Sequence, residues 1–233
     1  MSKFPWWLVV LFCIISLCLI TSCQNPSTTN STINDTCAQL EDRQKDNCYF
    51  EQVKCSKIKD SAIRDSCVVK LGVLKKDLKT CDLISDIQIK SYCQEQLAEL
   101  TNDTNICLKI NNSYWKDNCY YHFALNYSDD LFCLKMSNPL LQKECYKKLA
   151  YATQDAVLCD LLDSVESQTC YNKLARDTLN YELCQFLDNQ ILVDACVLKV
   201  AKLASNQTIC HNISISGIRT DCLNAFNATN STN

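Results

Sequence analysis

The chain of 233 residues has only two glycines and three prolines, so it contains few residues that break helices or form tight turns. The glycines needed for a phosphate-binding loop or a strained nucleophile turn are absent. Histidine is nearly as scarce. His122 and His211 lie in different parts of the sequence, and neither has a recurring partner for acid-base chemistry. We therefore expect that the protein is not an enzyme.

The chain also lacks a basic excess and the short cysteine spacings of metal and haem sites. Its formal net charge is -3, which gives no electrostatic reason to bind nucleic acid. Metal sites use ligands about two to four residues apart. The closest cysteines of the repeated region, Cys48 and Cys55, are seven residues apart. We expect no metal, no other cofactor and no nucleic-acid partner.

The one long apolar run lies near the N-terminus and predicts a signal peptide over residues 1–22. The run covers residues 6–20, follows the positive charge of Lys3, and is shorter than the roughly 20 residues of a membrane span. Residues 20–23, Ile-Thr-Ser-Cys, resemble the lipobox of prokaryotic lipoproteins. This resemblance implies lipidation at Cys23 and an extracytoplasmic protein anchored to the outer face of the cell membrane. An uncleaved apolar anchor and plain secretion are the alternatives.

Two polar segments flank the cysteine-containing region. Residues 23–36 are rich in Asn, Ser and Thr and predict a flexible stalk, and residues 228–233 predict a disordered tail. Glycosylation sequons recur along the chain. The same Asn and Thr residues also suit helix caps and turns, so both interpretations stay open. The candidate asparagines are Asn30, Asn34, Asn102, Asn111, Asn126, Asn206, Asn212, Asn227 and Asn230.

Sixteen cysteines form eight couples that recur about every 26 residues. A period of about 20 to 50 residues is typical of stacked repeats. An even number of cysteines behind a secretory signal indicates an oxidising compartment and disulfides. We therefore predict a helical-repeat ectodomain over residues 37–227. The couples, which define repeats one to eight, are Cys37–Cys48, Cys55–Cys67, Cys81–Cys93, Cys107–Cys119, Cys133–Cys145, Cys159–Cys170, Cys184–Cys196 and Cys210–Cys222.

Polar residues at two fixed positions predict that each repeat is a helical hairpin. Four residues before the first cysteine, a side-chain oxygen would cap a helix of about eight residues. Five residues after it, a second cap would begin a helix of about sixteen residues, with Ile215 as the exception. The first set is Asp77, Asp103, Asp129, Asp155, Asn180 and Asn206, and the second is Asp42, Asp60, Asp86, Asn112, Asn138, Ser164 and Asn189.

Apolar columns predict how the hairpins pack. An apolar residue stands three after the first cysteine in every repeat, and others stand four before and four after the second cysteine. Small residues next to the last column would let a neighbouring helix approach closely. They are Ala98, Ala124, Ala150, Ala175 and Ala201. The predicted fold is all-α, a solenoid-like array of eight short disulfide-stapled helical hairpins. In architecture it resembles other disulfide-stapled helical-hairpin arrays.

Helix geometry favours disulfides within repeats over disulfides between them. In repeat four the cysteines lie five and seven residues from the turn at Asn112, so their heights differ by about 3 Å. Pairing Cys119 with Cys133 would leave a mismatch of about 9 Å, too large for a disulfide. Because Cys48 and Cys55 are so close in sequence, we also predict that one helix runs unbroken across that first junction.

These features predict a non-enzymatic, surface-exposed and membrane-anchored binding or scaffolding module. The alternatives are a passive cell-envelope spacer and a thiol redox or metal-binding protein. Expected partners are the membrane and an unidentified protein or glycan. Two columns are candidate contact stripes, although packing of the tyrosines and solvation of the lysines are simpler interpretations. The stripes are Tyr49, Tyr120, Tyr146 and Tyr171, and Lys70, Lys148, Lys173 and Lys199.

Overall fold

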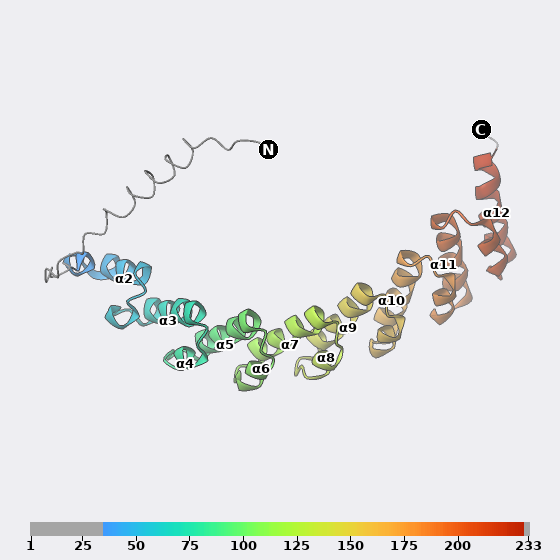
Figure 1. The fold of residues 1–233 in the computed structure, drawn as a ribbon. Helices are drawn as coiled ribbons and strands as arrows, with labels where there is room; N and C mark the ends of the chain where they lie inside the picture. Colours follow the sequence, from blue (N-terminus) through green and yellow to red (C-terminus); the bar gives the residue numbers. More distant parts are fainter. Residues whose placement is uncertain (1–34, 231–233) are drawn as a thin grey trace, which may run out of the picture. The chain divides into compact units, whose positions relative to one another are not determined.

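A computed structural model describes residues 35–230, and every regular element among them is a helix (Figure 1). None of these helices combines the length and the apolarity that crossing a bilayer requires. The chain divides into two compact parts, Met1–Glu41 and Asp42–Asn233. The predicted signal peptide, the lipidation site Cys23 and the stalk up to residue 34 lie outside the described residues, as do residues 231–233 of the predicted tail.

Short and long helices alternate along the described residues, as the hairpin prediction requires. The N-terminal part contributes the 3₁₀ helix η1 (Thr36–Gln39). The other short helices are η2 (Cys55–Lys57), α4 (Leu78–Cys81), α6 (Asn105–Lys109), α8 (Leu131–Leu134), η3 (Ala156–Leu161), η4 (Tyr181–Phe186) and η5 (Gln207–Asn212). The long helices are α2 (Asp42–Glu51), α3 (Ser61–Lys75), α5 (Ile87–Thr101), α7 (Ser113–Tyr127), α9 (Pro139–Thr153), α10 (Ser164–Asp177), α11 (Gln190–Leu203) and α12 (Ser216–Asn230).

The first helix of each hairpin is shorter than the sequence suggested. It has three to six residues instead of about eight, and an extended linker follows it. The apolar residue three after the first cysteine belongs to this linker, because Ile58, Ile110 and Ile213 have extended backbones. These side chains are still buried. A short extended segment therefore contributes to the core at a position where we had predicted a helix.

The predicted caps are largely confirmed. All six residues of the first set accept a hydrogen bond from the backbone N–H two residues later, at 2.9–3.0 Å. Asp60, Asp86, Asn112, Asn138 and Asn189 cap the long helices. Ser164 does not. In repeat six Asp163 accepts from the Glu166 N–H at 3.1 Å, because this repeat has one residue fewer between its cysteines. Asp42 lies inside α2 and does not precede it.

The long helices end in a left-handed residue, which the sequence did not indicate. Six of these residues have φ between 50 and 58° and none is glycine: Lys76, Asn102, Ser128, Gln154, Leu179 and Ser205. In repeats two, three, four and seven, the backbone N–H of the residue after the left-handed one donates a hydrogen bond to the carbonyl five residues before it. An example is the bond from the Asp103 N–H to the Ala98 carbonyl at 3.1 Å. The backbone N–H of this Asp or Asn therefore caps the end of one helix, while its side chain caps the start of the following helix.

The prediction of an unbroken helix at the first junction is wrong. Helix α2 ends at Glu51, and Val53 has φ of 55°. The Lys54 N–H then donates to the Tyr49 carbonyl at 2.9 Å, the same bond over five residues that follows repeats two, three, four and seven. The chain must reverse here because Cys55 pairs with Cys67, which lies on α3.

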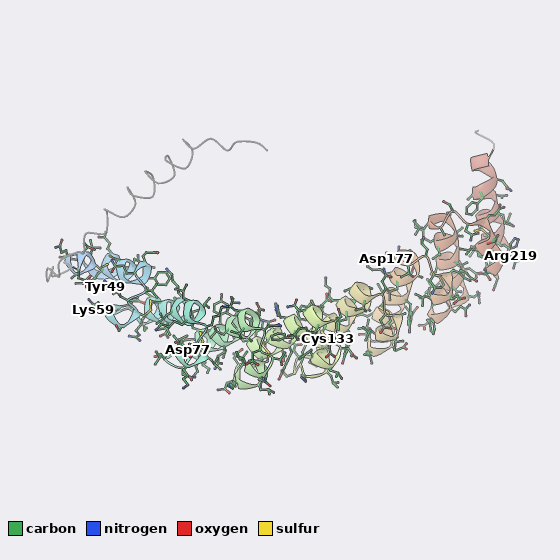
Figure 2. The ribbon with its side chains drawn as sticks, viewed as in Figure 1. Tyr49, Lys59, Asp77, Cys133, Asp177 and Arg219 are labelled. Atoms are coloured by element: carbon green, nitrogen blue, oxygen red, sulfur yellow. A yellow bond between two sulfur atoms is a disulfide. The ribbon has the colours of Figure 1, made fainter. Side chains whose placement is uncertain are left out.

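Disulfides within repeats staple the hairpins, as helix offsets predicted. Seven bonds join the predicted partners from Cys55–Cys67 to Cys210–Cys222, with Cα–Cα distances of 5.4–5.8 Å. Figure 2 marks Cys133, one partner of the repeat-five bond. Cys37 and Cys48 are also disulfide-bonded. The structure is thus an all-helical array of disulfide-stapled repeats.

Within residues 42–230, successive long helices pack against one another in chain order, from α3 to α12 (Figure 1). The alanine column lies at these contacts, and all five of its members are fully buried. Gly72 takes the same position in α3. A Cβ added there would lie 3.4 Å from the Cys93 Sγ, so this glycine faces repeat three instead of solvent.

Candidate functional site

The four tyrosines of the first candidate stripe are buried and do not form an exposed ladder. Their exposed fractions are 4% for Tyr49, 4% for Tyr120, 7% for Tyr146 and 3% for Tyr171. Burial raises the pKa of Tyr120 and Tyr146. The Tyr171 hydroxyl donates to Asp160 at 2.5 Å, and its ring stacks on Phe186. The packing interpretation therefore applies to this column.

The lysines of the second stripe do not converge on a common site. Three of them approach acidic residues: Glu51 for Lys70 at 3.7 Å, Glu144 for Lys148 at 3.9 Å, and Asp177 for Lys173 at 2.6 Å. The ammonium groups of Lys70 and Lys173 also lie over aromatic rings, those of Phe50 and Tyr151. Lys199 is exposed on α11. This arrangement is that of an ordinary solvated helix face.

The candidate glycosylation sites of the described residues are all at the surface. Asn102, Asn111, Asn126, Asn206, Asn212 and Asn227 are exposed, so glycosylation there remains a prediction. Asn206 also caps η5, and the Asn126 amide lies 2.6 Å from the His122 Nε2. Asn30 and Asn34 lie outside the described residues, and the side chain of Asn230 is not described.

The structure also contains buried carboxylates that the sequence columns had not revealed, and they connect successive repeats at four of the seven junctions. The Ser137 and Asn138 N–H groups donate to Asp117 at 2.9 and 2.8 Å. Asp194 accepts in the same way from Ser214 and Ile215, at 3.1 and 2.6 Å. The donors lie in the extended linker of the following repeat, where no helix can pair them. We call this arrangement the carboxylate clamp.

Two further aspartates make the clamp a recurring feature. Asp46 accepts from Lys59 and Asp60, and Asp65 accepts from Asp86. The backbone N–H groups of Lys59 and Asp60 lower the pKa of Asp46. All four aspartates stand two residues before a second cysteine, so the column itself could have revealed them.

The clamp is missing at three junctions, because Ser91, Lys143 and Gln168 occupy the aspartate position in repeats three, five and six. At the junction of repeats three and four this residue is Ser91. Ser91 is fully buried, and its Oγ has no hydrogen-bond partner among residues 35–230. A side-chain bond from Asn112 Nδ2 to Gln88 Oε1, at 2.9 Å, joins the two repeats instead. Farther along α5, burial raises the pKa of Glu95 to about 7, beside Glu99 and His122. Here the His122 Nδ1 lies 3.0 Å from Glu99.

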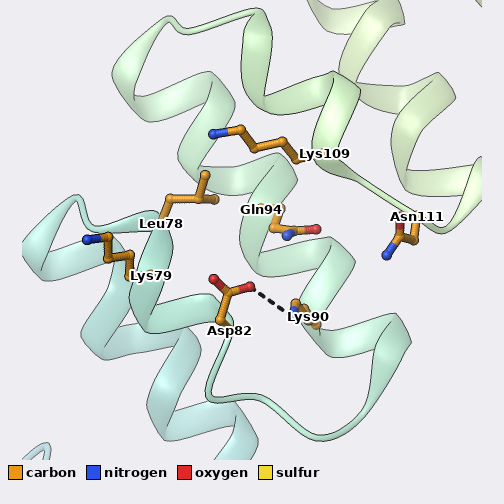
Figure 3. A pocket seen from close by; sticks show the side chains of 7 residues that line it. All are labelled: Leu78, Lys79, Asp82, Lys90, Gln94, Lys109 and Asn111. Atoms are coloured by element: carbon orange, nitrogen blue, oxygen red, sulfur yellow. Dashed lines mark ion pairs between the residues drawn. The ribbon is translucent and has the colours of Figure 1, made fainter.

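A basic pocket of about 290 Å³ lies at the same junction (Figure 3). Its walls come from α4, α5 and the region around the end of α6, and three lysines line it: Lys79, Lys90 and Lys109. Asp82 forms an ion pair with Lys90 at 2.8 Å. Lys79 and Lys109 form no ion pair with any residue that the structure describes, and the pocket therefore has a net positive charge. Figure 3 shows Lys109 extending above Leu78 and Gln94.

An aromatic pocket of about 450 Å³ lies between α5 and α7, again at this junction. The Trp115 ring centroid lies 5.0 Å from that of Tyr92 and 5.0 Å from that of Tyr114. Gln88 and Ile89 complete the lining, which contains no charged side chain. Neither pocket could be recognised from the sequence columns, because the residues of each pocket come from two repeats and share no column.

Within residues 35–230, no group of three or more His, Cys, Asp and Glu is arranged to hold a metal ion, and all sixteen cysteines are disulfide-bonded. The basic pocket and the aromatic pocket both lie at the junction of repeats three and four. Comparisons of the chain with protein-family models, curated proteins and solved structures find no match.

Proposed function

We propose that the protein is a non-enzymatic, extracytoplasmic binding module, anchored to the outer face of the membrane through its N-terminal region. Its contact surface is the junction of repeats three and four. The observation that carries this proposal is the concentration of irregularities there: a basic pocket, an aromatic pocket and a fully buried serine, Ser91, whose hydroxyl has no hydrogen-bond partner among the described residues. Repeat arrays commonly bind partners along extended faces that several repeats form together.

Two further observations support the assignment. Disulfides in every repeat fit an oxidising compartment outside the cytoplasm. The basic pocket lies in a chain of net charge -3, so its positive charge is local and suits an acidic group of a partner.

The proposal is tested by retention of cell-envelope material on the immobilised full chain. We expect saturable retention that becomes about tenfold weaker when Lys79→Glu and Lys109→Glu reverse the charge of the pocket. The matched control is Lys199→Glu with Lys202→Glu, on the exposed side of α11. This control should retain material like the unaltered chain.

The alternative of a passive spacer makes the opposite prediction. A spacer needs no specific contact, so neither the unaltered chain nor any variant would give a saturable signal. An equal loss of retention in the pocket variant and in the α11 control would also contradict the proposal, because it would indicate a general effect of charge.

A further inference from the structure

The aromatic pocket is separate from the basic pocket, although both lie at one junction. Gln88, Ile89 and Tyr92 lie on one face of α5, whereas Lys90 and Gln94 lie on the opposite face, as helical periodicity requires. The first three side chains line the aromatic pocket and the last two line the basic one. The two pockets therefore need separate explanations.

Tyr92 has no counterpart in the other repeats. The residue immediately before the second cysteine is polar or small in all seven of them: Asn47, Ser66, Asn118, Glu144, Thr169, Ala195 and Asp221. Hairpin packing therefore does not require an aromatic ring at this place. Tyr92 is 37% exposed and Tyr114 is 62% exposed. Large aromatic side chains held together at a surface are typical of binding sites.

The rings form a shallow aromatic surface that is largely open to solvent. The Tyr92 and Tyr114 planes are inclined to the Trp115 indole by 54° and 78°, and both tyrosines contact it. Gln88 adds an amide at the edge. Its Oε1 already accepts from Asn112, so its amide N–H groups stay available as donors. The volume of about 450 Å³ is within the usual range of small-molecule sites.

We propose that this pocket binds a neutral sugar ring of a glycan, which deepens the proposed function and rests on it. A pyranose has an apolar face of C–H groups and a rim of hydroxyls. The C–H face matches the electron-rich faces of Trp115 and the two tyrosines. The hydroxyl rim matches the Gln88 amide and the tyrosine hydroxyls.

Other ligands fit the lining less well. An anion would meet the negative faces of the rings and no cationic side chain. A quaternary ammonium suits aromatic rings, but the lining offers no carboxylate to balance its charge. An apolar peptide side chain would leave the Gln88 donors without partners.

Trp115 provides a direct probe, because the other two tryptophans of the chain, Trp6 and Trp7, lie near the N-terminus. In the full chain with Trp6→Phe and Trp7→Phe, fluorescence reports on Trp115 alone. Titration with cellotetraose and with chitotetraose, both neutral and β-linked, should change this fluorescence saturably for at least one of them. Tyr92→Asn should weaken that response about tenfold, since it removes one stacked ring. Asparagine occupies this column in repeats one and four, so the fold should tolerate it.

Tyr127→Asn is the matched control, because Tyr127 is 45% exposed on α7 but does not line the pocket. It should leave the sugar response unchanged, with circular dichroism confirming helix content in both variants. No response to either tetrasaccharide, or an equal loss in both variants, overturns the proposal. A response to choline chloride alone would do the same and would identify a cation site.

The same variants separate this proposal from the proposed function. If the Tyr92→Asn chain retains envelope material normally and neither sugar binds, the sugar site is wrong and the binding module stands. If no chain retains material saturably, the binding function itself fails, whatever the sugars do.

Discussion

At the scale of single residues, buried acidic groups have two opposite roles. The aspartates of the carboxylate clamp are buried as acceptors for backbone N–H groups, and for Asp194 these bonds outweigh the effect of burial, so its pKa is lowered. Glu95 is buried beside a second carboxyl group, that of Glu99. Its pKa rises because burial disfavours the charged form. Asp46 and Asp194 therefore stabilise the fold as anions, whereas Glu95 is best accommodated as a neutral acid.

The raised pKa of Glu95 predicts a pH dependence of stability. The folded chain binds the Glu95 proton more tightly than the unfolded chain between its ordinary pKa of 4.5 and about 7. The contribution of Glu95 to the free energy of unfolding should therefore be largest below pH 4.5. It should fall as the pH rises to about 7 and stay constant above that. The contribution over this whole range is about 3 kcal/mol. Urea unfolding at pH 5 and pH 8 measures it.

Glu95→Gln should remove this fall and stabilise the chain at pH 8. The matched control is Glu182→Gln, an exposed carboxylate of η4, which should keep the fall. An unchanged pH profile in Glu95→Gln would contradict the assignment of the effect to this residue.

The clamp predicts a local effect of Asp117→Ala. This change removes the acceptor of the Ser137 and Asn138 N–H groups and leaves both in a linker without another partner. Losing bonds to a charged acceptor should cost about 2 to 3 kcal/mol. Hydrogen exchange of these two amides should accelerate by about tenfold or more. Asp221→Ala, an exposed aspartate of α12, should leave their exchange rates unchanged.

At the scale of the helices, the sequence predicted the starts better than the ends. A helix start depends on one side chain and its neighbours, so Asp77 and Asn112 could be recognised directly. The ends depend on left-handed residues such as Lys76 and Leu179, whose side chains do not indicate that conformation. The clamp escaped prediction because its donors lie in the following repeat, about 20 residues away. The two pockets also combine residues of two repeats, which a search by columns cannot find.

Lys76→Gly tests the left-handed helix ends. Lys76 has φ of 52°, a conformation that costs a residue with a Cβ about 1 kcal/mol more than glycine. This change should therefore raise the free energy of unfolding by about 0.5 to 1 kcal/mol. The neighbouring change Lys75→Gly, in the last helical position of α3, should lower it. Thermal or urea unfolding of both variants gives the comparison, and equal signs would contradict the prediction.

At the scale of the whole molecule, each repeat depends on its own disulfide and on contacts with its neighbours. A hairpin with a first helix of three to six residues would not be stable in isolation. The disulfide restricts the unfolded hairpin, and the alanine-lined contacts bury its apolar side. Stability in such arrays is close to a sum of repeat and interface terms.

Removing one internal disulfide should therefore have a regional effect. Cys133→Ala with Cys145→Ala opens a loop whose closure contributes about 3 kcal/mol. Hydrogen exchange should accelerate in repeats four to six and change little in repeats two and eight. The equivalent change of Cys210 and Cys222 should affect repeats seven and eight only. Loss of protection along the entire chain would instead indicate a single cooperative unit.

The carboxylate clamp also gives the array a direction of assembly. In each clamp the acceptor belongs to the earlier repeat and the donors to the later one. A chain that folds from its N-terminus, as during synthesis, therefore presents the linker of each clamped junction with an aspartate that is already in place. Shortening the chain from its C-terminal side leaves aspartates that water can hydrate, whereas shortening it from the N-terminal side leaves linker amides without their acceptor.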